Sequence, residues 1–203
     1  MKKLLALALV LAMALSLCAC GSGKVPTAEE VKGSNDGKVY ENSYLGIKFT
    51  VKDAWYFLSD AEIAEIAGTT QDILSDAGND VQDATAYYDM MAMDENTGNN
   101  INIMVQVVGN VSDVNYDEIL DESEAEILQM GASIGAKYTF SEHTTVKLSG
   151  VEFHKMDAVG EMTEYGISYE QGCYIAVIDG VFVNITTTSY DGTPLTDIEA
   201  MFN

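Results

Sequence analysis

Alternation of apolar and polar residues is the main pattern of this chain from residue 38 onward, and it predicts a protein rich in β-strands. Residues 45–51 alternate in this way, which is typical of a half-buried strand, and 38–42 is expected to be its hairpin partner. Segment 84–94 carries large apolar side chains at both parities, which indicates a strand covered on both faces. The next segment, 100–107, alternates again and predicts another strand.

Four further strands are predicted in the second half of the chain: 138–148, 151–163, 166–178 and 181–189. The dipeptides Ser149-Gly150 and Asp179-Gly180 separate consecutive strands, and both have the residue types that two-residue hairpin loops favour. Because a hairpin places its two strands antiparallel, we expect an antiparallel sheet.

Three helices are predicted from capping signals and from apolar residues spaced three to four apart: 60–67, 116–130 and the segment that begins at Pro194. Ser59 and Glu62 form a capping box at the start of the first helix, and Gly68 is expected to end it. Thr193 is expected to cap the last helix. The order of elements predicts an α+β fold with a central antiparallel sheet of about six to seven strands covered by helices.

The N-terminus has the pattern of a secretory signal peptide: a basic start, an apolar run over 4–15, and a small residue, Ala19, before Cys20. Leu17, Ala19 and Cys20 resemble the lipobox of bacterial lipoproteins, although Cys18 stands where Ser, Ala or Thr is usual. The resemblance implies cleavage after Ala19 and a diacylglycerol on Cys20, which is therefore the predicted lipidation site. The apolar run is shorter than the roughly 20 residues that a membrane-spanning helix needs.

This interpretation divides the chain into three parts: a signal peptide over 1–19, the lipidated Cys20 with a flexible tether over 20–37, and a single domain over 38–203. The tether segment is polar and rich in Gly and Ser. The mature protein is expected at the extracytoplasmic face of the bacterial cell membrane. Two acyl chains such as palmitate on one sulfur are expected to hold it there durably.

The charge of the chain restricts its possible partners, and its cysteine content restricts its possible disulfides. The formal net charge is −22, and all ten basic residues are Lys. Nucleic-acid binding needs clustered basic residues that neutralise phosphates, so this composition excludes nucleic acid as a partner. Of the three cysteines, Cys18 leaves with the signal peptide and Cys20 carries lipid, so Cys173 is expected to form no intrachain disulfide.

Five residues near the start of the predicted domain have the spacing of a known motif: Tyr40, Asn42, Gly46, Phe49 and Trp55. They resemble the beginning of PsbP-like domains, which also occur in bacterial lipoproteins; Lys52 stands where a Pro is usual. The resemblance implies an α-β-α sandwich with a central antiparallel sheet. The motif is structural, so it brings no catalytic residue to this chain.

Three single residues have side chains that can bind a metal or act as a nucleophile: His143, His154 and Cys173. His143 lies on the polar parity of its strand and is expected to be exposed, whereas His154 shares parity with apolar residues and is expected to be partly buried. A metal site needs further ligands at suitable spacing, and the sequence suggests none. Cys173 shares parity with apolar residues, which indicates a thiol in the core rather than a nucleophile.

Polar and aromatic clusters are further candidates for binding sites. Asp94, Asn96, Gly98 and Asn100 resemble part of a calcium loop, but they lack the distal Glu and fit the tip of a hairpin better. Six acidic residues are expected on the solvated face of the helix over 116–130, with weak calcium capture as the alternative: Asp117, Glu118, Asp121, Glu122, Glu124 and Glu126. Three aromatic residues were assigned to the core, with a ligand site as the alternative: Trp55, Tyr56 and Phe57.

The sequence thus predicts a lipid-anchored binding or accessory module that is not an enzyme and needs no cofactor. Its expected partners are the membrane, through Cys20, and an envelope protein or a small ligand. The alternative is a surface lipoprotein that binds a small ligand or calcium through its acidic surface. A hydrolase is the third hypothesis, and it requires polar residues that converge in a pocket.

Overall fold

The computed structural model describes residues 25–76, 86–109, 111 and 113–203. The predicted signal peptide, its cleavage site and Cys20 lie outside the described residues. The described helices are α2 (Ala28–Val31), α3 (Asp60–Asp76), α4 (Tyr116–Ile134) and α5 (Leu195–Glu199). The short strands of the N-terminal part are β1 (Ser34–Asn35), β2 (Val39–Asn42), β3 (Ile47–Thr50) and β4 (Trp55–Phe57). The remaining strands are β5 (Ala86–Asp94), β6 (Asn100–Val107), β7 (Lys137–Phe140), β8 (Thr144–Leu148), β9 (Val151–Met162), β10 (Ile167–Ile178) and β11 (Val181–Ser189).

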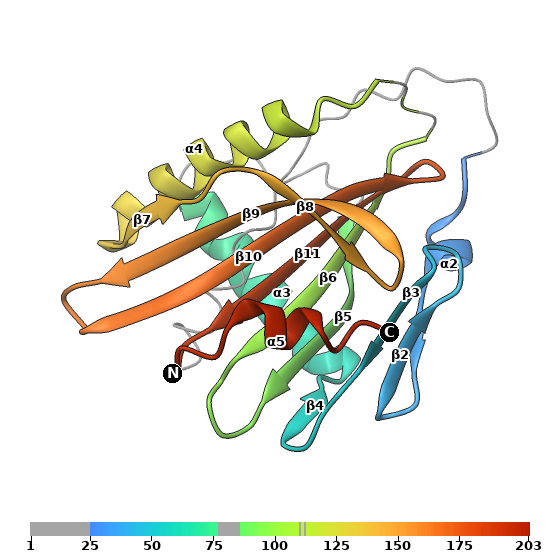
Figure 1. The fold of residues 1–203 in the computed structure, drawn as a ribbon, viewed down its shortest axis with the longest axis horizontal. Coiled ribbons are helices and arrows are strands. Elements are labelled where there is room, and N and C mark those ends of the chain that lie inside the picture. Colours follow the sequence, from blue (N-terminus) through green and yellow to red (C-terminus); the bar gives the residue numbers. More distant parts are fainter. Residues whose placement is uncertain (1–24, 77–85, 110, 112) are drawn as a thin grey trace.

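Two antiparallel sheets organise the described residues (Figure 1). The large sheet has eight strands in the order β4-β5-β6-β11-β10-β9-β7, with β8 also paired to β9. The small sheet has three strands in the order β1-β2-β3. The expected α+β class and antiparallel pairing are confirmed. The expected six to seven strands fall short of the eight of the large sheet, and the small sheet was not anticipated as a separate unit.

The two faces of the large sheet are covered by different elements. On one face, Ile101, Ile103 and Val105 of β6 pack with the small sheet and with residues of α5. On the other face, Met104 packs with apolar residues of α4, and Met91 with those of α3. Helices α3 and α4 therefore lie behind the sheet, and α5 lies in front of it, as Figure 1 shows. Helices cover the front face only in part, because the small sheet takes most of that role.

Ordered structure begins earlier than the expected domain start at Lys38. Helix α2 has a capping box between Thr27 and Glu30, and Val31 is fully buried in the core beneath the small sheet. Strand β1 then pairs with β2. The physical reason is that one apolar residue, Val31, binds this polar segment to the core, which composition alone does not reveal. Part of the expected tether therefore belongs to the fold.

A β-bulge in β5 fastens the small sheet to the large one. The register of β5 against β6 shifts between Tyr88 and Met90, which leaves Asp89 unpaired in the ladder. The Asp89 carboxylate accepts hydrogen bonds from the backbone N–H of Gly33, the hydroxyl of Tyr40 and the side-chain amide of Asn42. Tyr40 and Asn42, which open the PsbP-like motif, thus have a structural role.

The first long helix is longer than predicted. The capping box of Ser59 and Glu62 is confirmed, because each side chain bonds the backbone N–H of the other residue. Gly68 does not end α3, which continues to Asp76. Gly68 is exposed, and glycine inside a helix costs only about 1 kcal/mol, which a capped amphipathic helix tolerates.

The other helix ends and one strand also depart from prediction. Helix α4 runs through to Ile134 and ends at Gly135, which adopts the left-handed conformation at φ 75°. Thr193 does not cap α5, since Pro194 occupies the N-cap position without a side-chain hydrogen bond. The predicted strand over 138–148 is split into β7 and β8 by residues 141–143. Each described helix falls short of the length or the apolar character needed to span a bilayer.

Candidate binding pocket

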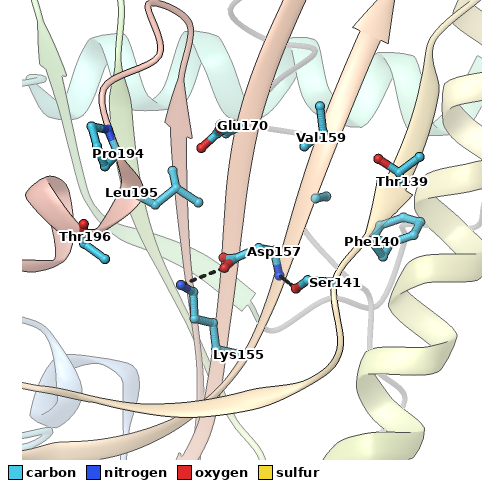
Figure 2. Close-up of a pocket in the computed structure, with 11 residues that line it drawn as sticks. Thr139, Phe140, Ser141, Lys155, Asp157, Val159, Glu170, Pro194, Leu195 and Thr196 are labelled. Atoms are coloured by element: carbon cyan, nitrogen blue, oxygen red, sulfur yellow. Dashed lines mark hydrogen bonds and ion pairs between the residues drawn. The ribbon is translucent and has the colours of Figure 1, made fainter.

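A pocket of about 360 Å³ opens on the front face of the large sheet, beyond the part that α5 covers (Figure 2). Four stretches of the chain form it: the end of β7, the middle of β9, the first part of β10, and the start of α5. Eleven residues line it: Thr139, Phe140, Ser141, Lys155, Asp157, Ala158, Val159, Glu170, Pro194, Leu195 and Thr196. Its volume falls in the range of roughly 300–1,000 Å³ that is usual for small-molecule sites.

Strand β9 supplies the base of this pocket. Side chains of alternate residues in a strand point to the same face, so Lys155, Asp157 and Val159 all lie on the front face of the sheet. Gly172 of β10 stands directly opposite Asp157 in the ladder. Because glycine has no side chain, the hydroxyl of Tyr174 fits across this position, and a Cβ there would collide with it.

Lys155 is the centre of a compact charge network. Its Nζ lies 2.8 Å from Asp157 Oδ2 and 2.8 Å from Glu199 Oε1, and 5.5 Å from the ring centre of Tyr174. The Tyr174 hydroxyl also donates to Glu199 Oε1 at 2.8 Å. Burial by itself lowers the pKa of Lys155, but the two carboxylates outweigh burial and raise this pKa above its ordinary value. The network fixes the end of α5 on the sheet and leaves the lysine charged.

Asp157 is also held by its backbone. Ser141 N donates to Asp157 O at 2.9 Å, and Ser141 Oγ accepts from Asp157 N at 3.2 Å. These bonds hold the first residue of the interruption between β7 and β8 against β9. The carboxylate oxygen Asp157 Oδ1 is buried and has no hydrogen-bond partner among the described residues. Glu170, on the neighbouring strand, is exposed at the rim.

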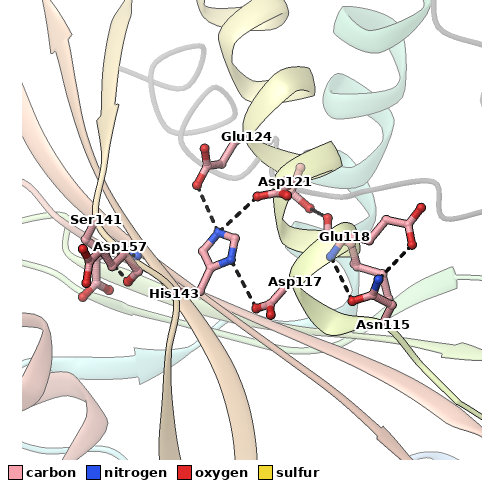
Figure 3. Close-up of polar contacts among 11 residues, drawn as sticks. Asn115, Asp117, Glu118, Asp121, Glu124, Ser141, His143 and Asp157 are labelled. Carbon is pink, nitrogen blue, oxygen red and sulfur yellow. Dashed lines mark hydrogen bonds and ion pairs between the residues drawn. The ribbon is translucent and has the colours of Figure 1, made fainter.

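His143 lies in the interruption between β7 and β8, and it faces α4 (Figure 3). Its ring nitrogens lie 3.1 Å from Glu124 Oε1, 3.5 Å from Asp117 Oδ1 and 3.9 Å from Asp121 Oδ1. Only 17 % of its side chain is exposed, so the expectation of an exposed histidine is wrong. The strand break turns this side chain under the helix, and three of the six acidic residues on α4 surround it.

This histidine cluster is a docking contact between α4 and the sheet. Asn115 caps α4 by accepting a hydrogen bond from the backbone N–H of Glu118. Within the described ranges, no group of three or more His, Cys, Asp or Glu side chains has the arrangement that a metal ion requires. Glu124 is the hydrogen-bond partner of the imidazole, and Asp117 and Asp121 lie near its ring nitrogens.

The other two isolated candidates are placed as expected, and each packs under α4. His154 is half-buried, and its ring stacks on Tyr116 with 3.9 Å between ring centres. Cys173 is buried in the core cluster beneath α4, and burial raises the pKa of its thiol to about 12. A thiol with that pKa remains protonated at neutral pH and is a poor nucleophile. The two histidines have different partners, so they do not form one site.

The remaining candidate clusters are structural. Asp94 Oδ1 accepts from the backbone N–H groups of Asn96 and Thr97, and Gly98 adopts a positive φ of 78°, as in a hairpin tip. These bonds use the oxygen that a calcium loop would direct at the ion. Trp55 and Phe57 pack against the core as predicted, whereas Tyr56 is 40 % exposed.

A strip of buried polar side chains on the rear face was not foreseen. It crosses the central strands β6, β11 and β10 and consists of Asn100, Asn102, Gln171, Asn184, Thr186 and Thr188, all at most 3 % exposed. Asn100 Oδ1 and Asn102 Nδ2 have no hydrogen-bond partner among the described residues. The alternation of β6 resembles that of a half-buried strand, so only knowledge of both covering layers reveals that these amides are buried.

Comparisons with known proteins identify the fold. No family model and no curated protein sequence matches the chain. Among solved structures, cyanobacterial PsbP (CyanoP) from Synechocystis sp. PCC 6803 is similar, with a TM-score of 0.52 and 7 % identity over 90 % of this chain and 92 % of that chain. A crystal structure from Bacteroides thetaiotaomicron VPI-5482 has a TM-score of 0.45 and 12 % identity over 81 % of this chain and 46 % of that chain. The likeness to CyanoP confirms that the chain has a PsbP-like fold.

Proposed function

We propose that this protein is a lipid-anchored accessory module of the bacterial cell envelope, which binds a partner without catalysing a reaction. The lipobox-like sequence around Cys20 supports the anchor, and two acyl chains on that residue provide durable membrane attachment. The pocket on the front face is the observation that carries the binding function. The partner is an envelope protein or a small ligand.

The chemistry of the pocket favours binding over catalysis. Its one lysine is already paired with two carboxylates, so it is neither a free base nor a free nucleophile. Both histidines and Cys173 lie among the elements of the rear face, away from the pocket lining. A pocket with apolar walls and a few fixed polar groups is typical of recognition sites.

Site-specific photo-crosslinking in intact cells tests this proposal. A photoreactive residue at Thr196, an exposed position on the pocket rim, is expected to give a discrete product with the partner. The matched control carries the same residue at Leu128, which is 49 % exposed on α4 on the opposite face of the sheet. Equal products from both positions, or none from Thr196, would contradict a binding function of the pocket.

A further inference from the structure

The lining of the pocket has two chemically different parts. Val159, Pro194 and Leu195 provide apolar surface in the lining, and the side chains of Asp157 and Glu170 lie between them. The lining contains two carboxylates, Asp157 and Glu170, and one ammonium group, Lys155, which also pairs with Glu199 outside the lining. The charge of the pocket lining is therefore negative, like the net charge of −22 of the whole chain. A negative protein attracts cations and repels anions before contact is made.

An anionic ligand finds no free positive group here. The ammonium group of Lys155 is paired with Asp157 Oδ2 and Glu199 Oε1, and it lies 5.5 Å from the ring centre of Tyr174. A carboxylate or phosphate would have to displace one of these partners and would meet the charge of the remaining ones. The pairing of Lys155 with two carboxylates thus disfavours anions as ligands.

Acceptors for a cation are available at the same place. Asp157 lines the pocket, and its Oδ1 has no donor among the described residues, which is an energetically costly state for a buried acceptor. No hydrogen bond or ion pair to the Glu170 carboxylate is present within the part of the chain that the structure describes. The two groups lie on neighbouring strands of one face, with the apolar surface beside them.

We propose that this pocket binds a primary ammonium group at the end of an aliphatic stem, with the stem against the apolar surface and the charge beside Asp157 and Glu170. This proposal rests on the binding function proposed above. The same chemistry occurs in the lysine side chain of a partner protein and in a free alkylamine.

Isothermal titration of the full lipidated protein in nonionic detergent micelles tests the ligand class. The probes are pentylamine and N-acetyl-lysine amide, with pentanoate and pentanol as anionic and neutral controls of the same stem length. Both amines, or one of them, are expected to bind, and the two controls are not. Stronger binding of the lysine derivative indicates a partner side chain as the source, and stronger binding of pentylamine indicates a free amine.

Three variants locate the binding. Glu170→Gln is expected to weaken amine binding about threefold, because an exposed ion pair contributes little free energy. Asp157→Asn is expected to weaken it about tenfold. Glu161→Gln is the matched control, because Glu161 lies exposed on the same face of β9 but outside the pocket. Melting temperatures establish that each variant is folded. Since Asp157 also binds Lys155, the result for Glu170→Gln decides if Asp157→Asn does not fold.

The outcomes separate this inference from the proposed function. Amine binding that Glu170→Gln leaves unchanged, or equal binding of pentanol or pentanoate, would overturn the assignment of an ammonium site. If no probe binds but Thr196 still crosslinks to a partner, the binding module stands and its ligand is not an amine. If neither result is obtained, both proposals are contradicted.

Discussion

At the scale of single residues, the buried polar strip on the rear face is the least expected feature of the molecule. A buried amide without a partner destabilises a protein by about 1–3 kcal/mol. Asn102 Nδ2 is in this state, and the residue is 3 % exposed on the rear face of the sheet. Asn184 lies on the neighbouring strand β11, two residues before Thr186, which is opposite Asn102. It accepts hydrogen bonds from Cys173 Sγ at 3.6 Å and from Thr186 Oγ1 at 3.4 Å. The two asparagines therefore provide a matched comparison.

Asn102→Leu is expected to stabilise the fold by about 1 kcal/mol, because it replaces an unpartnered amide with an apolar group of similar size. Asn184→Leu is expected to destabilise it by a similar amount, since it leaves Thr186 without its acceptor. Urea unfolding of both variants measures the free energies. A loss of stability in Asn102→Leu as large as that in Asn184→Leu would show that Asn102 has a partner after all.

Asp191 gives the fold a pH-dependent contribution. The side-chain amide of Asn99 and the backbone N–H of Thr193 donate to its carboxylate and lower its pKa to about 2. Since this pKa is below the value of about 3.9 in an unfolded chain, the carboxylate stabilises the fold above pH 4. That contribution is lost as the pH falls through 2.

Asp191→Asn is therefore expected to lower the melting temperature at pH 7, and the difference from the parent protein is expected to shrink at pH 2.5. Differential scanning calorimetry at both pH values measures it. A difference of the same size at both pH values would mean that the charge of Asp191 does not contribute.

At the scale of elements, two glycines inside helices have opposite roles. A Cβ on Gly68 of α3 meets no atom within 4 Å, whereas a Cβ on Gly131 of α4 would lie 2.7 Å from the ring of Tyr138 on β7. Gly131 therefore permits the close approach of α4 to the sheet, and Gly68 has no such packing role.

Gly68→Ala is expected to raise stability by about 0.5–1 kcal/mol, through the better helix propensity of alanine. Gly131→Ala is expected to lower stability by about 1–3 kcal/mol, because Tyr138 must move. Thermal unfolding of both variants checks the signs. If both substitutions stabilise, Gly131 does not set the distance between α4 and β7.

The same elements show what the sequence predicts and what it does not. Hairpins were predicted correctly at Ser149-Gly150 and Asp179-Gly180, because the positive φ that such a turn requires is encoded in the two residues themselves. The break at 141–143 was missed, since it depends on contacts of Ser141 with β9 and of His143 with α4. The pocket was missed for the same reason: it joins four segments that are separate in sequence, and none of them has a motif.

At the scale of the whole molecule, the Asp89 carboxylate connects the N-terminal segment to the large sheet. Its three donors come from Gly33, Tyr40 and Asn42. Burial and the neighbouring Asp89 charge both raise the pKa of Tyr40, so its phenol remains a donor at neutral pH. The folded region therefore begins shortly after Cys20. The seven residues over 20–26 span at most about 25 Å, which limits the distance between a lipidated Cys20 and the start of α2.

Asp89→Asn is expected to destabilise the protein by about 2 kcal/mol, because the new amide group faces donors. Tyr40→Phe removes only one of the three donors and is expected to cost about half as much. Hydrogen exchange is expected to show faster exchange in β1 and β2 in both variants. The exposed Asp53→Asn is the control for a lost charge, and an equal effect of that substitution would contradict a specific role of Asp89.

The proposed function depends first on membrane attachment through Cys20, and the mass of the mature N-terminus tests this attachment. Mass spectrometry of the protein purified from cell membranes is expected to find Cys20 as the first residue, with a diacylglycerol on its sulfur. The Cys20→Ala variant is expected to carry no lipid and to leave the membrane fraction. An intact Met1, or an unmodified thiol on Cys20 in the membrane-purified protein, would contradict the account.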